Sequence, residues 1–186
     1  MAIGRTSREL DVLLVGATGF TGKLVASYLA RRTPHVRVGL AGRSLDKLKH
    51  AAEEASSSSS SWDPPLLQYP TDDREALLAL ASRARVVLST AGPYSICGTP
   101  LVSACVASGT DYVDINGEVP WVREMIQSFD AAAMENGTIL VPNCGCAHKF
   151  GCATAHAHRC TIAGMKVVSD DLKNSFAGCT HAVRSP

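Results

Sequence analysis

Three glycines near the start of the chain have a spacing that suits a phosphate ligand. Gly16, Gly19 and Gly22 come directly after an apolar run and directly before a segment of helical periodicity. The first permits a tight turn, the second lets backbone N–H groups approach a pyrophosphate, and the third allows close packing of helix on strand. The helix that follows adds unpaired N–H donors and partial positive charge. The pattern predicts a dinucleotide site, with a glycine-rich turn that binds nothing as the alternative. The predicted contacts are Gly16, Ala17, Thr18, Gly19, Phe20, Thr21 and Gly22.

A basic residue follows the second apolar run, where dinucleotide-binding domains distinguish their cofactors. Arg43 and Ser44 stand there, and no acidic side chain ends the run. In proteins that prefer NAD, an acid roughly 20 residues past the glycines binds the ribose 2′-hydroxyl. A guanidinium can instead bind a 2′-phosphate and stack on adenine. We therefore predict NADP(H) as the cofactor, with a solvated surface arginine as the alternative.

A third group of candidates ends the fourth apolar run. Small residues there would leave room for a ribose and a nicotinamide, because ligands of open α/β sheets bind at the carboxyl ends of the strands. Tyr94 could line that space, donate a proton, or pack in the core. Further along, Asp111, Asp114 and Glu118 form an acidic set that capping chemistry explains as well as a site does. The candidates at the run itself are Thr90, Ala91, Gly92, Pro93 and Tyr94.

Thiols and imidazoles are concentrated in a short segment after the last predicted strand. On a helix, Cys152, His156 and Cys160 would share one face, and that spacing can bind Zn²⁺. Paired C-x₂-C elements are absent, and cysteine is also a common buried hydrophobe. An ordinary helix face is therefore the alternative, and we assign no metal ligand. The segment contains Cys144, Cys146, His148, Cys152, His156, His158 and Cys160.

Alternating strands and helices must position these candidates. Apolar runs of strand length alternate with segments of helical period, joined by short connections. This order predicts an α/β fold with a doubly wound, Rossmann-type parallel sheet. The predicted strands are 12–15, 36–41, 66–69, 86–90, 112–115 and 138–141. The predicted helices are 24–32, 44–55, 76–81 after a cap at Asp72, 101–107 and 121–133.

Composition and charge exclude several classes of protein. The 186 residues are 46% hydrophobic and 19% charged, and the net charge of +1 gives no electrostatic case for nucleic acid. No apolar run approaches the roughly 20 residues of a transmembrane segment, and the N-terminus lacks a signal core. The odd number of cysteines, 7, argues against a disulfide framework. We expect an intracellular, cytoplasmic protein in which the serine run 56–61 is a flexible surface insertion.

Several motifs follow one another in a characteristic order, at residues 11–22, 40–44, 92–94, 98–102 and 109–118. Together they resemble the saccharopine dehydrogenase-like oxidoreductases, the family that includes the trans-acting enoyl reductases. The resemblance covers roughly residues 9–146. It implies an NADP-binding Rossmann domain followed by a second α+β domain for substrate and homodimer contacts. It also implies reduction of a small, lipid-like enoyl substrate, and an association with lipid droplets or membranes.

The chain departs from the family pattern after its last predicted strand. The family continues Cys-Gly-Phe-Asp-Ser-x-Pro-x-Asp-Leu-Gly, whereas residues 144–151 read CGCAHKFG. We therefore predict an NADP-binding domain over residues 9–145. Residues 146–186 are predicted to be a divergent, incomplete remnant of the substrate and dimerisation domain, in a truncated copy or a fragment. The leading hypothesis is an NADP(H)-dependent oxidoreductase, and the alternative is a catalytically impaired NADP-binding or lipid-associated interaction protein. Whether this chain is itself an enzyme is left open.

Overall fold

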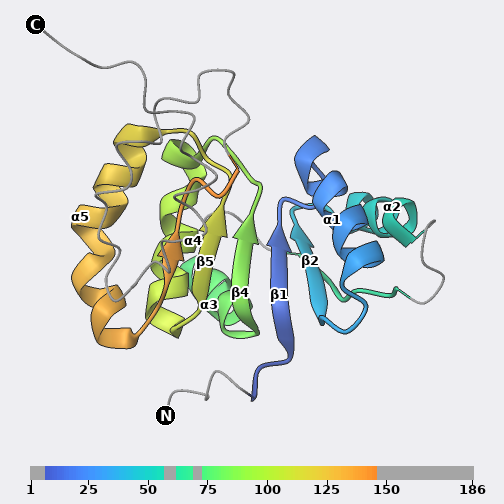
Figure 1. Ribbon diagram of the computed structural model, residues 1–186, viewed down its shortest axis with the longest axis horizontal. Helices are drawn as coiled ribbons and strands as arrows, with labels where there is room; N and C mark the ends of the chain where they lie inside the picture. The colour runs from blue at the N-terminus through green and yellow to red at the C-terminus, as the bar shows by residue number, and fades with distance from the viewer. Residues whose placement is uncertain (1–6, 57–61, 69–72, 146–186) are drawn as a thin grey trace, which may run out of the picture.

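A parallel sheet organises the part of the chain that the structure describes. The computed structural model describes residues 7–56, 62–68 and 73–145. The strands are β1 (Leu10–Val15), β2 (Val38–Gly42), β3 (Leu66–Gln68), β4 (Ala84–Ser89), β5 (Asp111–Asp114) and β6 (Leu140–Val141). They lie in the order β3-β2-β1-β4-β5-β6, and every neighbouring pair is parallel (Figure 1). This is the order of a doubly wound Rossmann sheet, so the predicted fold class is confirmed.

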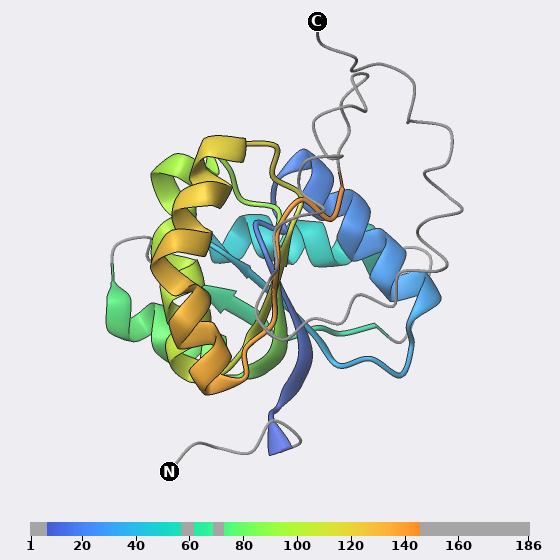
Figure 2. The same cartoon turned by 60° about the vertical axis from the view of Figure 1, so that its left-hand side comes forward.

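Helices cover both faces of this sheet. They are α1 (Phe20–Arg32), α2 (Leu45–Ser56), α3 (Arg74–Ser82), α4 (Tyr94–Ser108) and α5 (Val119–Asn136). α1 packs with α2 on one face, while α4 packs with both α3 and α5 on the other (Figure 2). Among the helices within the described ranges, none is both long and apolar enough to cross a lipid bilayer.

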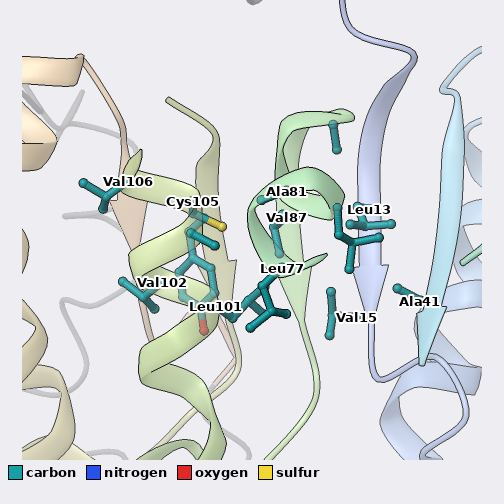
Figure 3. Packing of buried hydrophobic residues seen from close by; sticks show 14 of the residues in the cluster. Leu13, Val15, Ala41, Leu77, Ala81, Val87, Leu101, Val102, Cys105 and Val106 are labelled. Carbon is teal, nitrogen blue, oxygen red and sulfur yellow. The ribbon is translucent and has the colours of Figure 1, made fainter. Parts of the chain in front are cut away.

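Buried side chains form an apolar cluster on each face of the sheet. Successive residues of a strand point to opposite faces, so β1 contributes to both clusters. Leu13 and Val15 lie in the cluster with α3, α4 and α5, and Leu14 lies in the cluster with α1 and α2. Figure 3 shows Leu77 of α3 and Leu101 of α4 in the first of these clusters. β1 is thus a central strand buried on both sides, as its continuous apolar run predicts.

The pairing register brings the carboxyl ends of the central strands into line. Val15 of β1 pairs with Ala41 of β2 and with Ser89 of β4, and Ser89 pairs in turn with Asp114 of β5. The loops that follow these residues therefore leave the sheet at one edge. In a doubly wound sheet, ligands bind at that edge where the strand order reverses, which here is the crevice between β1 and β4.

Charged side chains hold the opposite, amino edge of the sheet. Arg8 is buried and donates to the main-chain oxygens of Ala84 and Ser108, at 2.5 and 2.6 Å. It joins the start of β4 to the end of α4. On the other side of β1, Asp11 accepts hydrogen bonds from Nε and Nη2 of Arg37 at 3.1 and 3.0 Å. These hydrogen bonds lower the pKa of Asp11 to about 2.

The helix after β4 begins earlier than the sequence predicts. α4 starts at Tyr94 and runs through Gly98 and Pro100, ahead of the predicted start at residue 101. Both residues usually interrupt helices, and for that reason the sequence pattern favoured the later start. Gly98 serves close packing instead, because a Cβ there would lie 2.7 Å from the ring of Trp121.

Two smaller predictions also need correction. α3 is capped by Asp73, whose side chain accepts a hydrogen bond from the main-chain N of Ala76 at 3.0 Å. The predicted cap, Asp72, lies outside the described residues. Ser56 belongs to α2 rather than to the predicted serine insertion, because its hydroxyl donates to the main-chain O of Ala52 at 2.8 Å. The rest of that insertion lies outside the described residues.

Candidate dinucleotide site

The loop between β1 and α1 has a conformation that requires glycine. Gly16 has a φ of 84°, in the left-handed region that other residues rarely adopt. A Cβ on Gly16 would lie 2.9 Å from both the main-chain N of Ala91 and Oγ1 of Thr90. A Cβ on Gly22 would lie 2.1 Å from the main-chain O of Gly16, so a side chain there would push α1 off the loop. Ala17, between them, is fully buried. This loop therefore holds α1 and the end of β4 close together.

Gly19, at the start of α1, has one backbone atom near the position of an added Cβ. Its backbone is extended, with φ −77° and ψ 167°, and the nearest atom to an added Cβ would be the main-chain O of Gly16 at 3.4 Å. Within the described residues no side chain caps α1, and the first turn contains no acid. The side chain of Phe20 is 83% exposed beside it, and Thr21 is half-buried. The first N–H groups of α1 are thus available to an anion.

The end of β2 lies beside the same loop. A Cβ on Gly42 would contact Cγ2 of Thr18 at 3.6 Å. Arg43, the next residue, is exposed, and its main-chain O accepts a hydrogen bond from Nε2 of Gln68 at 3.0 Å. Ser44 is half-buried directly before α2. Arg43 therefore flanks the glycine loop on the side away from β4, where a 2′-phosphate is recognised in NADP-binding domains. Sequence reasoning missed Gln68, which only the pairing of β3 with β2 brings to this edge.

Thr90 holds the glycine loop against the end of β4. Its main-chain N donates to the O of Val15 at 2.9 Å. Its Oγ1 lies 3.0 Å from that same oxygen and 3.2 Å from the O of Gly16. The hydroxyl thus holds the glycine loop in place beside the end of β4. Residues 91–93 follow as a half-buried to exposed turn that borders the crevice between β1 and β4.

Most of the described chain matches a known protein family. Residues 12–141 match the family described as the saccharopine dehydrogenase NADP-binding domain. The chain belongs to this family. The resemblance inferred from the motifs is therefore confirmed, and so is NADP as the cofactor of the domain.

Curated relatives of this chain include mycobacterial proteins. A Mycobacterium tuberculosis protein, named provisionally as a trans-acting enoyl reductase, is 44% identical over 140 residues, which are 75% of this chain and 33% of that protein. The trans-acting enoyl reductase of Mycobacterium bovis is 41% identical over 138 residues, or 74% of this chain and 32% of its own. The chain thus spans about a third of the length of the curated relatives it matches.

Solved structures support the fold. Saccharopine dehydrogenase (L-Glu forming) from Saccharomyces cerevisiae superposes with a TM-score of 0.60 at 23% identity, over 73% of this chain and 27% of that one. A short-chain dehydrogenase from Salmonella enterica gives a TM-score of 0.52 at 16% identity, over 70% of this chain and 73% of that one. At these identities the likeness concerns the Rossmann architecture alone.

Tyr94 packs inside this NADP-binding domain. Its ring is 5% exposed, lies 5.6 Å from the ring of Trp121, and its hydroxyl donates to the main-chain O of Ser89 at 2.9 Å. Burial, with a smaller contribution from the charge of Asp114, raises the pKa of Tyr94 to about 12. Of the roles considered from the sequence, packing is the one that describes this side chain.

Two members of the acidic set form internal hydrogen bonds at opposite ends of β5, Asp111 at its start and Asp114 at its end. Asp111 accepts from the main-chain N of Ile139 at 2.9 Å. Asp114 is fully buried and accepts from the N of Asn143 at 2.8 Å and from the hydroxyl of Tyr112 at 2.9 Å. Burial, reinforced by this carboxylate, raises the pKa of Tyr112. Hydrogen bonds within the fold therefore account for Asp111 and Asp114.

The cysteine-rich segment contributes one residue to the described structure. Cys144 is exposed, and its Sγ donates to the main-chain O of Val141 at 3.1 Å. Partial desolvation, followed by the nearby charge of Asp114, raises the pKa of this thiol. Across residues 7–56, 62–68 and 73–145, no His, Cys, Asp and Glu side chains form a group that could hold a metal ion. The predicted helix face with Cys152, His156 and Cys160 lies outside these ranges.

Proposed function

We propose that this chain binds NADP(H) in the crevice between β1 and β4, as the cofactor domain of a reductase for enoyl, lipid-like substrates. The start of α1 carries the proposal, because an added Cβ at Gly19 would meet one backbone oxygen there, at 3.4 Å, and, within the described residues, neither a capping side chain nor a first-turn acid competes for the N–H groups. A helix start of this kind binds pyrophosphate. Membership of the saccharopine dehydrogenase NADP-binding family supports the cofactor, and the mycobacterial relatives' names support the enoyl substrate.

Different residues along this edge would hold different parts of the cofactor. The glycine loop and the N–H groups of α1 would bind the pyrophosphate. Arg43 and Ser44 would bind the 2′-phosphate, and residues 90–93 would border the nicotinamide. Bound NADPH supplies the hydride, and the protein supplies orientation and electrostatics. Thr90 contributes by keeping the glycine loop against β4, through its hydrogen bonds at 3.0 and 3.2 Å to the loop's main-chain oxygens.

The substrate side of the proposal depends on the longer relatives. The proteins named trans-acting enoyl reductase are about three times as long as the segment they share with this chain. We assign residues 9–145 to cofactor binding and residues 146–186 to the divergent remnant of the substrate and dimerisation domain. A homodimer and an association with lipid droplets or membranes belong to the same proposal. The match over residues 12–141 does not favour the alternative of an interaction protein without catalysis.

Calorimetric titration of the 186-residue chain with NADPH and with NADH tests the cofactor assignment. A hydrogen bond to a charged group contributes about 1.5–3 kcal/mol, so NADPH should bind about ten- to a hundredfold tighter than NADH. Arg43→Ala should remove most of that difference. Arg123→Ala, at an exposed position of α5, is the matched control and should leave it unchanged. Equal affinities in the unmodified chain would contradict the 2′-phosphate assignment, and binding of neither would contradict the site.

Oxidation of NADPH in the presence of a 2-enoyl thioester tests the reductase part of the proposal. In a protein that joins this cofactor domain to a complete substrate domain, the proposal predicts that NADPH absorbance falls as the double bond is reduced. The alternative, an NADP-binding interaction protein, predicts tight binding of NADPH with no change in its absorbance on addition of the thioester.

A further inference from the structure

The turn between β4 and α4 is held by contacts on two sides. On one side, its residue Ala91 lies against the glycine loop, close enough that a Cβ on Gly16 would come within 2.9 Å of the Ala91 main-chain N. On the other side, the thiol of Cys97 donates to the main-chain O of Pro93 at 3.0 Å. The turn is therefore a fixed part of the crevice wall, and its position depends on where α4 begins.

Glu118 determines where α4 begins. Its Oε1 accepts a hydrogen bond from the main-chain N of Tyr94 at 2.7 Å, and its Oε2 accepts one from the N of Ser95 at 2.9 Å. The side chain of Ser95, followed by these main-chain N–H groups, lowers the pKa of Glu118. The residue at the N-cap of α4 is Pro93, which has no side chain able to cap the helix. A carboxylate from a different element thus replaces the missing cap.

Glu118 is held in turn by a chain of hydrogen bonds from β5. The main-chain N of Glu118 donates to Oδ1 of Asn116 at 2.6 Å. The amide nitrogen of Asn116 donates to both carboxylate oxygens of Asp114, at 3.2 Å each. Asn116 and Asp114 are both buried, at 2% and 0% exposure, so these bonds are protected from competition with water. The position of Glu118 is therefore fixed by the end of β5.

We propose that Glu118 is a positioning residue for the nicotinamide half of the cofactor. It acts through the main-chain N–H groups of Tyr94 and Ser95, which fix the turn at residues 91–93. The inference rests on the proposed cofactor site. In that site the adenosine half lies on the β2 side of the glycine loop, at Arg43, and the nicotinamide half lies on the β4 side. Movement of the turn would therefore disturb one half of the cofactor and spare the other.

Two ligands separate these halves in a titration of the 186-residue chain. NADPH reaches both sides of the glycine loop, whereas adenosine 2′,5′-bisphosphate carries only the adenosine half. Glu118→Ala should weaken NADPH about tenfold, because the cofactor would then have to order the freed turn at a cost of about 1.4 kcal/mol. Binding of adenosine 2′,5′-bisphosphate should stay within about twofold. Glu118→Gln keeps one acceptor oxygen and should give an intermediate loss for NADPH. Glu124→Gln, exposed on α5, is the control and should change neither affinity.

Each outcome decides between the inference and its alternatives. Selective loss of NADPH affinity, with partial rescue in Glu118→Gln, supports the positioning role. Equal loss of both ligands in Glu118→Gln, or normal binding of both in Glu118→Ala, overturns it, because Glu118 would then be a general structural residue or dispensable. If the unmodified chain binds neither ligand, the proposed function itself fails, and this result is distinct from any of the variant results.

Discussion

Two glycines of one loop should respond differently to a single added side chain. At Gly19 the backbone is extended and the nearest atom to a Cβ would be 3.4 Å away, so Gly19→Val should fold. Valine favours extended backbone, but its methyl groups would fill the space in front of the first N–H groups of α1. Each lost hydrogen bond to a phosphate is worth about 1.5–3 kcal/mol. NADPH and NADH should therefore both bind at least about tenfold more weakly.

Gly22→Ala should have the opposite effect. Its Cβ would lie 2.1 Å from the main-chain O of Gly16 and 2.8 Å from Cα of Ala17. Both are backbone atoms, so α1 must move as a whole to relieve the overlap. Overpacking typically costs about 1–3 kcal/mol, and we expect the upper end of that range here. For a protein of this size, about 3 kcal/mol lowers Tm by about 6–12 °C.

Thermal unfolding without ligand, followed by calorimetric titration at a temperature where each variant is folded, measures the two effects separately. Gly19→Val should keep the Tm of the unmodified chain to within a few degrees and lose cofactor affinity. A folded Gly19→Val protein that binds NADPH normally would place the phosphate site elsewhere. A Gly22→Ala protein with the same Tm as the unmodified chain would contradict the close contact between α1 and the loop.

Three further predictions concern stability and loop geometry. Because Arg37 lowers the pKa of Asp11 to about 2, the stabilisation by this pair is fully present above about pH 4 and is lost as the pH falls towards 2. Since Arg37 is exposed and solvent screens the pair, we expect a small stabilisation. It is measured as the difference in urea unfolding between the unmodified chain and Asp11→Asn, and this difference should vanish at the acid end. Arg8→Ala leaves buried carbonyls without a donor and should lower the free energy of unfolding by about 3 kcal/mol, whereas Arg123→Ala should change it by less than about 0.5 kcal/mol. Thr90→Val removes the hydroxyl that holds the glycine loop, so it should lower the free energy of unfolding in urea by about 1 kcal/mol. The affinity for NADPH should also fall about two- to fivefold. If neither value changes, the main-chain hydrogen bond of Thr90 is enough to hold the loop.

The features that the sequence predicted correctly depend on residues close together in the chain. β1 is an apolar run buried on both faces, and such runs are typical of central strands in parallel sheets. The tight turn at Gly16 and the packing of Gly22 follow from glycine spacing within one loop. The fold class followed from the alternation of strand and helix patterns, which is typical of a doubly wound parallel sheet.

The features that the sequence did not predict depend on distant partners. From the sequence, Arg8 is an ordinary polar residue near the N-terminus. Only the fold places it beside Ser108, 100 residues away. From the sequence, Glu118 could equally be a site residue or a cap. Its hydrogen bonds to Tyr94 and Ser95 become understandable only once α4 is known to begin at Tyr94. That start was itself hidden by Gly98, whose role is the contact with Trp121 from another helix. Local propensity describes none of these contacts, because tertiary packing decides them.

The position of β1 between β2 and β4 has a consequence for the order of folding. β2 follows β1 closely in the chain, but the hydrogen bond from Thr90 to Val15 spans 75 residues. Contacts so distant in sequence form slowly, because a long loop must close before they contribute. During synthesis, β1, α1, β2 and α2 leave the ribosome well before β4. Until β4 joins the sheet, Gly16 has neither Thr90 nor Ala91 against it, so the dinucleotide loop takes its final shape late. Cofactor binding during folding would therefore indicate that the centre of the sheet has assembled.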